Sequence, residues 1–194
     1  DIAVATLALI SLLPLLVGIA LTIKIVDPGP IFFAHGRLGR YGRSFPCLKF
    51  RTMVVDADER LRRLLESDAG ARREWECDHK LRDDPRVTRF GRFLRQTSLD
   101  ELPQLLSVIT GQMSLVGPRP IVSGEVVRYG RYFDDYCQLR PGITGLWQIS
   151  GRNDVSYARR VACDVLFRRR RSFALHVYIL VMTVPNVLLQ RGSY

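Results

Sequence analysis

The first 26 residues constrain this chain most, because an apolar stretch of near-membrane length carries a proline in its middle. No charged residue lies between Ile2 and Ile23, and about 20 apolar residues suffice for a transmembrane helix. Pro14 lies within this stretch, where it removes one backbone donor and its ring clashes with the carbonyl of Ile10. Ser11 is placed to bond a carbonyl that this break frees. The stretch therefore predicts two helical halves with a break near Ser11 and Pro14.

Two arrangements of this segment remain open from its residues alone. Each half, Ile2–Leu13 and Leu15–Val26, would be about 18 Å long at 1.5 Å per residue, and the hydrocarbon core is about 30 Å thick. A kinked helix could still cross the bilayer, because membrane helices tolerate proline. A re-entrant hairpin would instead enter and leave by the same face. A cleaved signal peptide is disfavoured, since no basic region precedes the stretch and no small-residue cleavage site ends it. The apolar stretch follows directly after the first residue, Asp1, so we expect further residues upstream in the natural protein.

The charge balance of the chain indicates an anionic partner. The formal net charge is +10 over 194 residues, which suits nucleic acid, anionic lipid or a phosphorylated small molecule. The four cysteines are widely spaced with no C-x-x-C pair, so we expect reduced, intracellular thiols in place of a disulfide or zinc framework. The three histidines are scattered, which disfavours a histidine metal site.

The remainder of the chain predicts one domain, mainly helical with a small β-hairpin. Asp27–Pro30 is a turn, and short apolar runs at Ile31–Ala34 and Phe45–Phe50 enclose a Gly/Arg loop typical of a hairpin. Phe173–Leu189 is apolar with arginines at both ends, which favours a helix lying flat on lipid headgroups. The other predicted helices share amphipathic or apolar patterns and span Val54–Cys77, Val87–Leu94, Leu102–Ile109, Val126–Gln138 and Val155–Phe167.

The sequence SLDELPQL places two carboxylates, Asp100 and Glu101, in front of a proline. A helix that contains Pro103 loses no hydrogen bond only if it begins at Asp100 or later. One hypothesis is therefore structural: Asp100 caps the helix, and Ser98 and Glu101 form a capping box. The other hypothesis is that Asp100 and Glu101 are a reactive pair.

Arginines on stiff backbone favour the reactive pair. Arg119 lies between two prolines, Arg140 precedes Pro141, and Arg152 follows a glycine. Such arginines lose little conformational entropy when they bind a phosphate in bidentate fashion. Carboxylates beside a diphosphate would repel it unless a divalent cation lay between them, so the pattern predicts Mg²⁺.

Three blocks of the chain carry a family resemblance: KFRTM, DDPRVTRFGRFLRQTSLDELPQLLSVITGQMSLVGPRP and RPGITGLWQISGRND. They resemble the bacterial polyprenyl-phosphate glycosyl-1-phosphate transferases, which are monotopic phosphoglycosyl transferases. The closest similarity is to the catalytic domain of undecaprenyl-phosphate galactose phosphotransferases. The resemblance covers nearly the whole chain. It departs from the family in that Ser11 and Pro14 are not adjacent, and that the extra N-terminal membrane region of large members is missing from this sequence.

The resemblance implies a monotopic protein on the cytoplasmic face of the bacterial inner membrane. Residues 1–26 would form the re-entrant helix-break-helix, and residues 27–194 a compact cytoplasmic catalytic domain with amphipathic interfacial helices. Residues 172–190 would be the interfacial C-terminal helix. Membrane lipids and a second copy of the chain, as a homodimer, are the partners that the resemblance implies besides the substrates.

The resemblance also implies a reaction in polysaccharide or glycoconjugate assembly. Asp100 would attack a UDP-sugar, UDP-galactose or UDP-glucose, to form a sugar-phosphoryl aspartate and release UMP, and undecaprenyl phosphate would then accept the sugar phosphate. Glu101 would position Mg²⁺, together with Asp100, or assist the incoming nucleophile. The residues that match phosphate- or substrate-binding positions of the family are Arg95, Arg119, Arg140, Arg152, Lys49, Arg51 and Asp164.

Two other classes of function fit the sequence less well. A membrane-anchored nucleic-acid binder would need aromatic residues interleaved with basic ones, and no recognition motif is present, so we expect no nucleic-acid partner. A catalytically silent scaffold would not need the Asp-Glu pair and its arginines.

Overall fold

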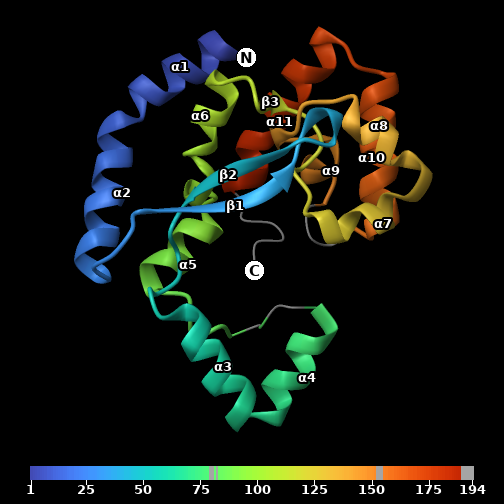
Figure 1. Cartoon of the computed structure of the whole chain (residues 1–194). Helices are drawn as coiled ribbons and strands as arrows, with labels where there is room; N and C mark the ends of the chain where they lie inside the picture. The colour runs from blue at the N-terminus through green and yellow to red at the C-terminus, as the bar shows by residue number, and fades with distance from the viewer. Residues whose placement is uncertain (79–80, 82, 152–154, 189–194) are drawn as a thin grey trace.

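The computed structural model describes residues 1–78, 81, 83–151 and 155–188, and these form a mainly helical chain with two small two-stranded sheets (Figure 1). This architecture confirms the predicted mainly helical fold with a β-hairpin. The long hairpin runs across the middle of the molecule, between the N-terminal helices on one side and the C-terminal helices on the other.

The apolar N-terminal segment forms two helices, α1 (Ile2–Ser11) and α2 (Leu13–Val26), which are bent by 61° at the break between them. Pro14 lies in the first turn of α2, where its missing N–H would have had no helical partner. The hydroxyl of Ser11 donates to the carbonyl of Leu7 at 2.8 Å. Of the helices described, none could cross a membrane alone, whereas this bent pair has the length and composition to do so together. The predicted helix-break-helix is therefore present.

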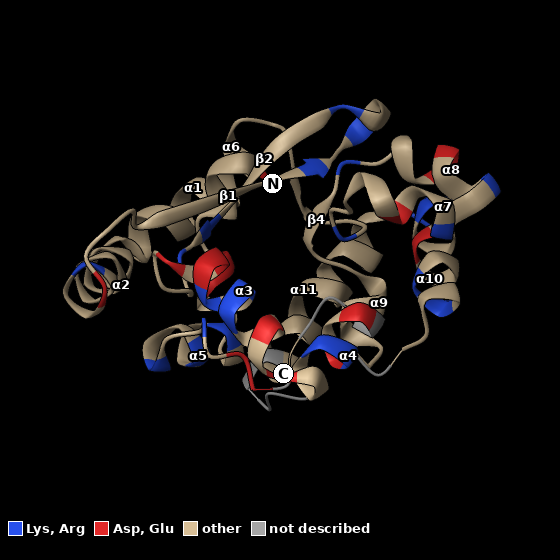
Figure 2. Ribbon diagram, turned by 60° about the horizontal axis from the view of Figure 1, so that its bottom comes forward, with Lys and Arg blue, Asp and Glu red and all other residues tan. Residues whose placement is uncertain are grey.

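Each half of this pair buries one side only. Ala5 of α1 lies in the largest core cluster with residues of α6 and α11, and Ile19 and Ile23 of α2 pack with Phe50 and Leu94. The opposite side is apolar and exposed. Figure 2 shows no charged residue on α1 or α11, whereas charged residues lie on the hairpin, on α3 to α5, on α7, α8 and α10, and at the end of α2.

The β-hairpin pairs β1 (Phe32–Leu38) antiparallel with β2 (Ser44–Phe50). Its tip is the 3₁₀ turn η1 (Arg40–Gly42), where Tyr41 and Gly42 both have positive φ, at 61° and 68°. The predicted hairpin with arginines at its tip is confirmed, with strands of seven residues each.

The predicted single helix over Val54–Cys77 is wrong, because the chain breaks at Asp68. The structure has α3 (Ala57–Ser67) and α4 (Ala69–Asp78) as a separate helical arm (Figure 1). The carboxylate of Asp68 accepts hydrogen bonds from the backbone N–H groups of Gly70 and Ala71, so it starts a new helix in place of continuing the old one.

The segment that carries the acidic pair is a helix, a tight turn and a second helix. Helix α5 (Arg89–Gln96) has Thr88 as its N-cap, and the hydroxyl of Thr88 accepts from the N–H of Gly91 at 2.8 Å. The 3₁₀ turn η2 (Leu99–Glu101) follows, and α6 (Gln104–Ile109) begins only after Pro103. The capping hypothesis is wrong, because Ser98 is left-handed (φ 58°) with no side-chain capping bond and Asp100 lies outside α6.

Helix α5 approaches the chain after β2 so closely that only glycine fits at position 91. A Cβ at Gly91 would lie 2.0 Å from the carbonyl oxygen of Thr52. We therefore expect Gly91→Ala to destabilise the fold by at least about 2 kcal/mol, since backbone must move. Thermal unfolding measures this, with Gly124→Ala as control because a Cβ there meets nothing within 4 Å. Equal melting temperatures for the two variants would contradict this close packing.

The C-terminal half adds a second sheet that the sequence did not predict. β3 (Ser114–Val116) pairs parallel with β4 (Gly142–Thr144). The predicted helix over Val126–Gln138 is interrupted, because Gly130 has φ 51° between two short helices. The elements of this half are η3 (Ser123–Glu125), α7 (Val126–Tyr129), η4 (Gly130–Tyr132), α8 (Phe133–Cys137), α9 (Leu146–Ile149), α10 (Tyr157–Arg169) and α11 (Phe173–Leu188).

Candidate active site

The acidic pair faces a lysine from the hairpin. Lys49 of β2 places its Nζ 2.6 Å from Oε1 of Glu101 and 3.6 Å from Oδ2 of Asp100. Asp100 is buried, with 8% of its surface exposed, and the Glu101 side chain is 16% exposed. Two carboxylates thus share one ammonium group in a partly desolvated site, where electrostatic interactions exceed those at a free surface.

The local sequence explains why both carboxylates reach this lysine. The left-handed Ser98 turns the chain sharply, and Leu99 packs against the buried Phe50 and Leu94. Leu99 therefore anchors η2 beneath the hairpin. Asp100 and Glu101, the next two residues of the turn, are left facing Lys49.

Arg119 is a second cation that binds Glu101. Its Nη2 donates to Oε1 of Glu101 at 3.1 Å. The loop that carries it is fixed to the hairpin, because Leu38 and Ile121 form an isolated antiparallel bridge. The buried hydroxyl of Tyr136 strengthens this link by donating to the carbonyl of Leu38 at 2.6 Å and accepting from the N–H of Ile121 at 3.3 Å. Arg119 is thereby held between two prolines on a braced loop.

The environment separates the two carboxylates electrostatically. Burial raises the pKa of Asp100; Lys49 opposes this rise and Glu101 adds to it. Burial also acts to raise the pKa of Glu101, but Arg119 and Lys49 outweigh it and lower that pKa to about 2. Glu101 is therefore the fixed anion of the pair. Asp100 is the more basic carboxylate, so it is the stronger nucleophile when ionised.

Of the other predicted site residues, Arg95 belongs with this cluster and Arg51 does not. Arg95 of α5 donates from Nε to the Thr52 hydroxyl at 2.9 Å. Burial lowers the pKa of Arg95, and the negative charge of Asp100 opposes this change. Arg51 is 9% exposed and its guanidinium binds the carboxylate and carbonyl of Asp27, so it fixes the turn after α2 and does not join the cluster.

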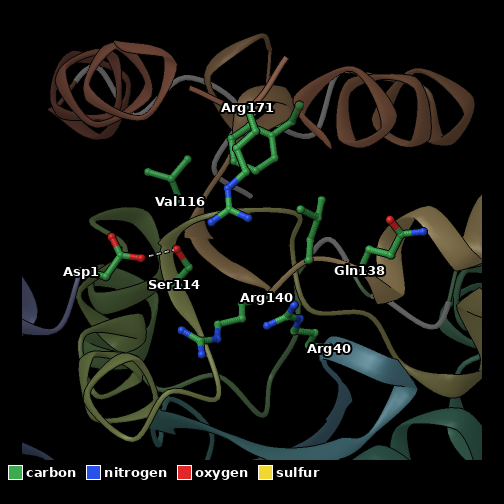
Figure 3. A pocket seen from close by; sticks show the side chains of 9 residues that line it. Asp1, Arg40, Ser114, Val116, Gln138, Arg140 and Arg171 are labelled. Carbon is green, nitrogen blue, oxygen red and sulfur yellow. Dashed lines mark hydrogen bonds between the residues drawn. The ribbon is translucent and has the colours of Figure 1, made fainter. Parts of the chain in front are cut away.

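Arg140 and Asp164 lie outside the cluster as well. Arg140 lines a separate cavity (Figure 3). Asp164 of α10 is 3% exposed and accepts from the Tyr129 hydroxyl at 2.7 Å. Burial raises the pKa of Asp164 to about 7 against the effect of this hydrogen bond. Arg152 lies outside the described residues.

Two residues that the sequence did not single out line the hollow beside Glu101. Arg37 of β1 and Gln104 of α6 share it with Lys49, Glu101 and Arg119. Arg37 also lies 3.8 Å from Glu125 and contacts the carbonyl of Pro120. The glycines around Arg37 mark a hairpin, but its register, which aims Arg37 at this hollow, has no local sequence signal.

The carboxylates of Asp100 and Glu101 suit Mg²⁺ that is shared with a substrate better than a metal ion bound by protein ligands alone. In the part of the chain that the structure describes, no group of three or more Asp, Glu, His or Cys side chains could hold a metal ion. Mg²⁺ is usually bound through one or two carboxylates together with substrate phosphates. Lys49 and Arg119 both contact Oε1 of Glu101, and Lys49 also lies 3.6 Å from Oδ2 of Asp100, so the two carboxylates lie close to the same ammonium group. The pair therefore fits a metal that completes its coordination with a phosphorylated substrate.

Comparison with known proteins decides the family. The bacterial sugar transferase family matches residues 1–190. The chain belongs to this family. The resemblance seen in the sequence is thus confirmed, and so is the prediction that the protein is a transferase.

Three relatives show how far the similarity extends. The exopolysaccharide production protein ExoY of Sinorhizobium fredii is 50% identical over the whole chain and 86% of its own length. The undecaprenyl-phosphate galactose phosphotransferase of Salmonella typhimurium is 50% identical over the whole chain, which spans 40% of that protein. The UDP-glucose:undecaprenyl-phosphate glucose-1-phosphate transferase of Xanthomonas campestris is 38% identical, and the chain spans 39% of it.

Proposed function

We propose that this protein transfers a sugar 1-phosphate from UDP-galactose or UDP-glucose to undecaprenyl phosphate and releases UMP, as an early membrane step of exopolysaccharide assembly. The names of the relatives support this substrate class. The observation that carries it is the split carboxylate pair: a basic Asp100 beside a Glu101 fixed by Lys49 and Arg119.

The proposed chemistry has two displacements at one phosphorus atom. The Asp100 carboxylate attacks the β-phosphorus of the UDP-sugar, a P–O bond to Asp100 forms, and the bond to the bridging oxygen breaks, so that UMP leaves. The phosphate of the lipid then attacks the same phosphorus, which gives a lipid diphosphate sugar and frees Asp100. A carboxylate nucleophile divides one difficult displacement into two easier ones.

The remaining residues stabilise charge and orientation in these steps. Lys49 lies near Asp100, and Arg119 binds the adjacent Glu101. Both cations would therefore stabilise the negative charge that develops on the transferred phosphoryl oxygens. The charge of Asp100 acts on Arg95, and Thr52 holds the guanidinium of Arg95, so this arginine can orient the attacked phosphate. Asp100 and Glu101 would hold Mg²⁺, which supplies charge neutralisation between the carboxylates and the diphosphate.

The N-terminal helices would place this site at a lipid surface. We propose that α1 and α2 form a re-entrant hairpin on the cytoplasmic face of the inner membrane and that α11 lies at the interface. Support comes from the 61° bend and from the exposed apolar side chains on α1, α2 and α11. The acceptor phosphate would then meet Asp100 at headgroup level.

The pKa values of the pair predict how the first displacement depends on pH. The step needs ionised Asp100, so its rate falls as the pH drops through the raised pKa of that residue. Glu101→Gln removes a charge that raises this pKa and leaves Lys49 to Asp100 alone, so we expect the acidic limb to move to lower pH. The pH profile of UMP release without lipid acceptor measures the limb. Glu66→Gln on the exposed α3 is the control, and a limb that stays in place or moves upward in Glu101→Gln would contradict this coupling.

The experiment that tests the function is UMP release from a panel of UDP-sugars with undecaprenyl phosphate in detergent. We expect UMP and the lipid-linked product in equal amounts with UDP-galactose or UDP-glucose. Release of the free sugar phosphate, or no UMP with any UDP-sugar, would contradict the proposed reaction.

A further inference from the structure

A second cationic site lies apart from the acidic pair. A cavity of about 160 Å³ is lined by three arginines from separate segments (Figure 3). Arg40 comes from the hairpin tip, Arg140 precedes β4, and Arg171 connects α10 to α11. In Figure 3, Arg171 enters the cavity from the side opposite to Arg40 and Arg140. Neither Asp100 nor Glu101 lines it.

The charge of this cavity is not balanced by its own lining. Its one carboxylate, Asp1, accepts a hydrogen bond from the Ser114 hydroxyl at 2.5 Å. Three guanidinium groups and one carboxylate leave a net charge of +2. Among the described residues, none of the three arginines has an ion pair with a carboxylate. An anion would therefore be attracted here, and all three arginines are exposed enough to reach it.

Part of the cavity wall is apolar and buried. Val116, Leu139 and Phe167 line it and are each at most 5% exposed. Arg140 is fixed by the proline that follows it, whose carbonyl accepts from the N–H of Ser114 at 2.8 Å. Arginines beside an apolar wall bind a phosphate more strongly than arginines in free solvent, because the local dielectric is lower.

The surroundings of the cavity indicate that the anion belongs to a lipid. Asp1 directly precedes α1, and Arg171 lies two residues before α11. Both helices begin with apolar side chains in solvent, among them Val4 at 57%, Leu7 at 67% and Phe173 at 86% exposed. A cationic pocket between two exposed apolar helix faces complements a headgroup phosphate with acyl chains beside it.

We propose that Arg40, Arg140 and Arg171 bind the phosphate of an anionic membrane phospholipid and so fix the protein's depth and orientation at the membrane. This rests on the membrane association proposed above, but not on the chemistry at Asp100. The site is separate from the one that the reacting phosphates occupy. Its ligand is a structural lipid whose phosphate carries no compensating cation.

Flotation of the full chain with vesicles tests the proposal. Wild type should bind vesicles containing phosphatidylglycerol more tightly than vesicles of phosphatidylcholine alone. Arg40→Gln/Arg171→Gln should reduce this preference by at least about tenfold, since it removes two guanidinium groups that hydrogen-bond the lipid phosphate directly, whereas the control below removes only surface charge. The matched control is Arg43→Gln/Arg169→Gln, which removes the same charge from the same hairpin tip and the same end of α10 without touching the cavity.

If both double variants lose the same amount of preference for phosphatidylglycerol vesicles, the preference comes from general surface charge and the proposal is overturned. An unchanged preference in Arg40→Gln/Arg171→Gln, with calorimetric binding of inorganic phosphate or UMP to wild type, would assign the cavity to a soluble phosphate instead. Absence of vesicle binding by wild type would also overturn it. The transferase proposal fails by a different result, the absence of UMP release in detergent.

Discussion

Asp100→Asn is expected to abolish both the sugar-phosphoryl adduct and the lipid-linked product. The substitution keeps the shape of the side chain but removes the charge that attacks phosphorus. Turnover should fall by at least about a thousandfold, because no other group takes over as nucleophile in a covalent mechanism. Asp100→Glu keeps the charge but displaces the oxygen, and a shift of about 1 Å costs on the order of a hundredfold. Initial rates of UMP release, with and without undecaprenyl phosphate, measure both effects.

The matched control for Asp100→Asn is Glu101→Gln, which removes the neighbouring charge instead. Lys49 then keeps Asp100 as its partner at 3.6 Å, so some adduct should still form when UDP-sugar is given without acceptor. Melting temperatures show whether either variant has lost its fold. Substantial turnover by a folded Asp100→Asn protein would remove Asp100 from the covalent step.

Removal of divalent cations is expected to abolish turnover in the intact protein. Asp100 and Glu101 bring two carboxylates to a site where a diphosphate must also bind, and Lys49 and Arg119 already pair with Glu101. Without a metal, like charges at about 4 Å would repel strongly in this partly buried site. EDTA should reduce UMP release to background, and added Mg²⁺ should restore it.

Binding of Mg²⁺ with the substrate can be measured separately from turnover. Calorimetric titration of UDP-sugar into Asp100→Asn should still show binding that Mg²⁺ strengthens, because Glu101 and the diphosphate remain as ligands. Full activity of wild type in EDTA would exclude a divalent cation from the mechanism. Ca²⁺ in place of Mg²⁺ should support less turnover, since its coordination is larger and less regular.

The sequence predicted the elements with strong local signals. Pro14 marked the break between α1 and α2, and the two apolar runs around a Gly/Arg loop marked the hairpin. The breaks at Asp68 and Gly130 were missed, because helical periodicity continues across both positions and the cap or positive φ overrides it. The parallel pairing of β3 with β4 was missed as well, since each strand has three residues and they lie far apart in sequence.

The sequence indicated which residues to consider for the site, but not how they are arranged. The motif identified Asp100, Glu101 and Arg119, and the structure brings them together with Lys49. It could not show that Arg51 serves the turn at Asp27, because that contact joins residues 24 positions apart. Nor could it show that Arg140 faces a different cavity, since the direction of a side chain beside a β-strand depends on the packing of the whole sheet.

The central claim is that Asp100 carries the transferred sugar phosphate as a covalent intermediate. The most direct test is to incubate wild type with UDP-galactose or UDP-glucose without lipid, quench the mixture in acid, and map the modified peptide by mass spectrometry. We expect one sugar-phosphoryl group on Asp100, formed with one equivalent of UMP and removed when undecaprenyl phosphate is added. An adduct on Glu101, or efficient turnover through a ternary complex with no adduct at all, would contradict the claim.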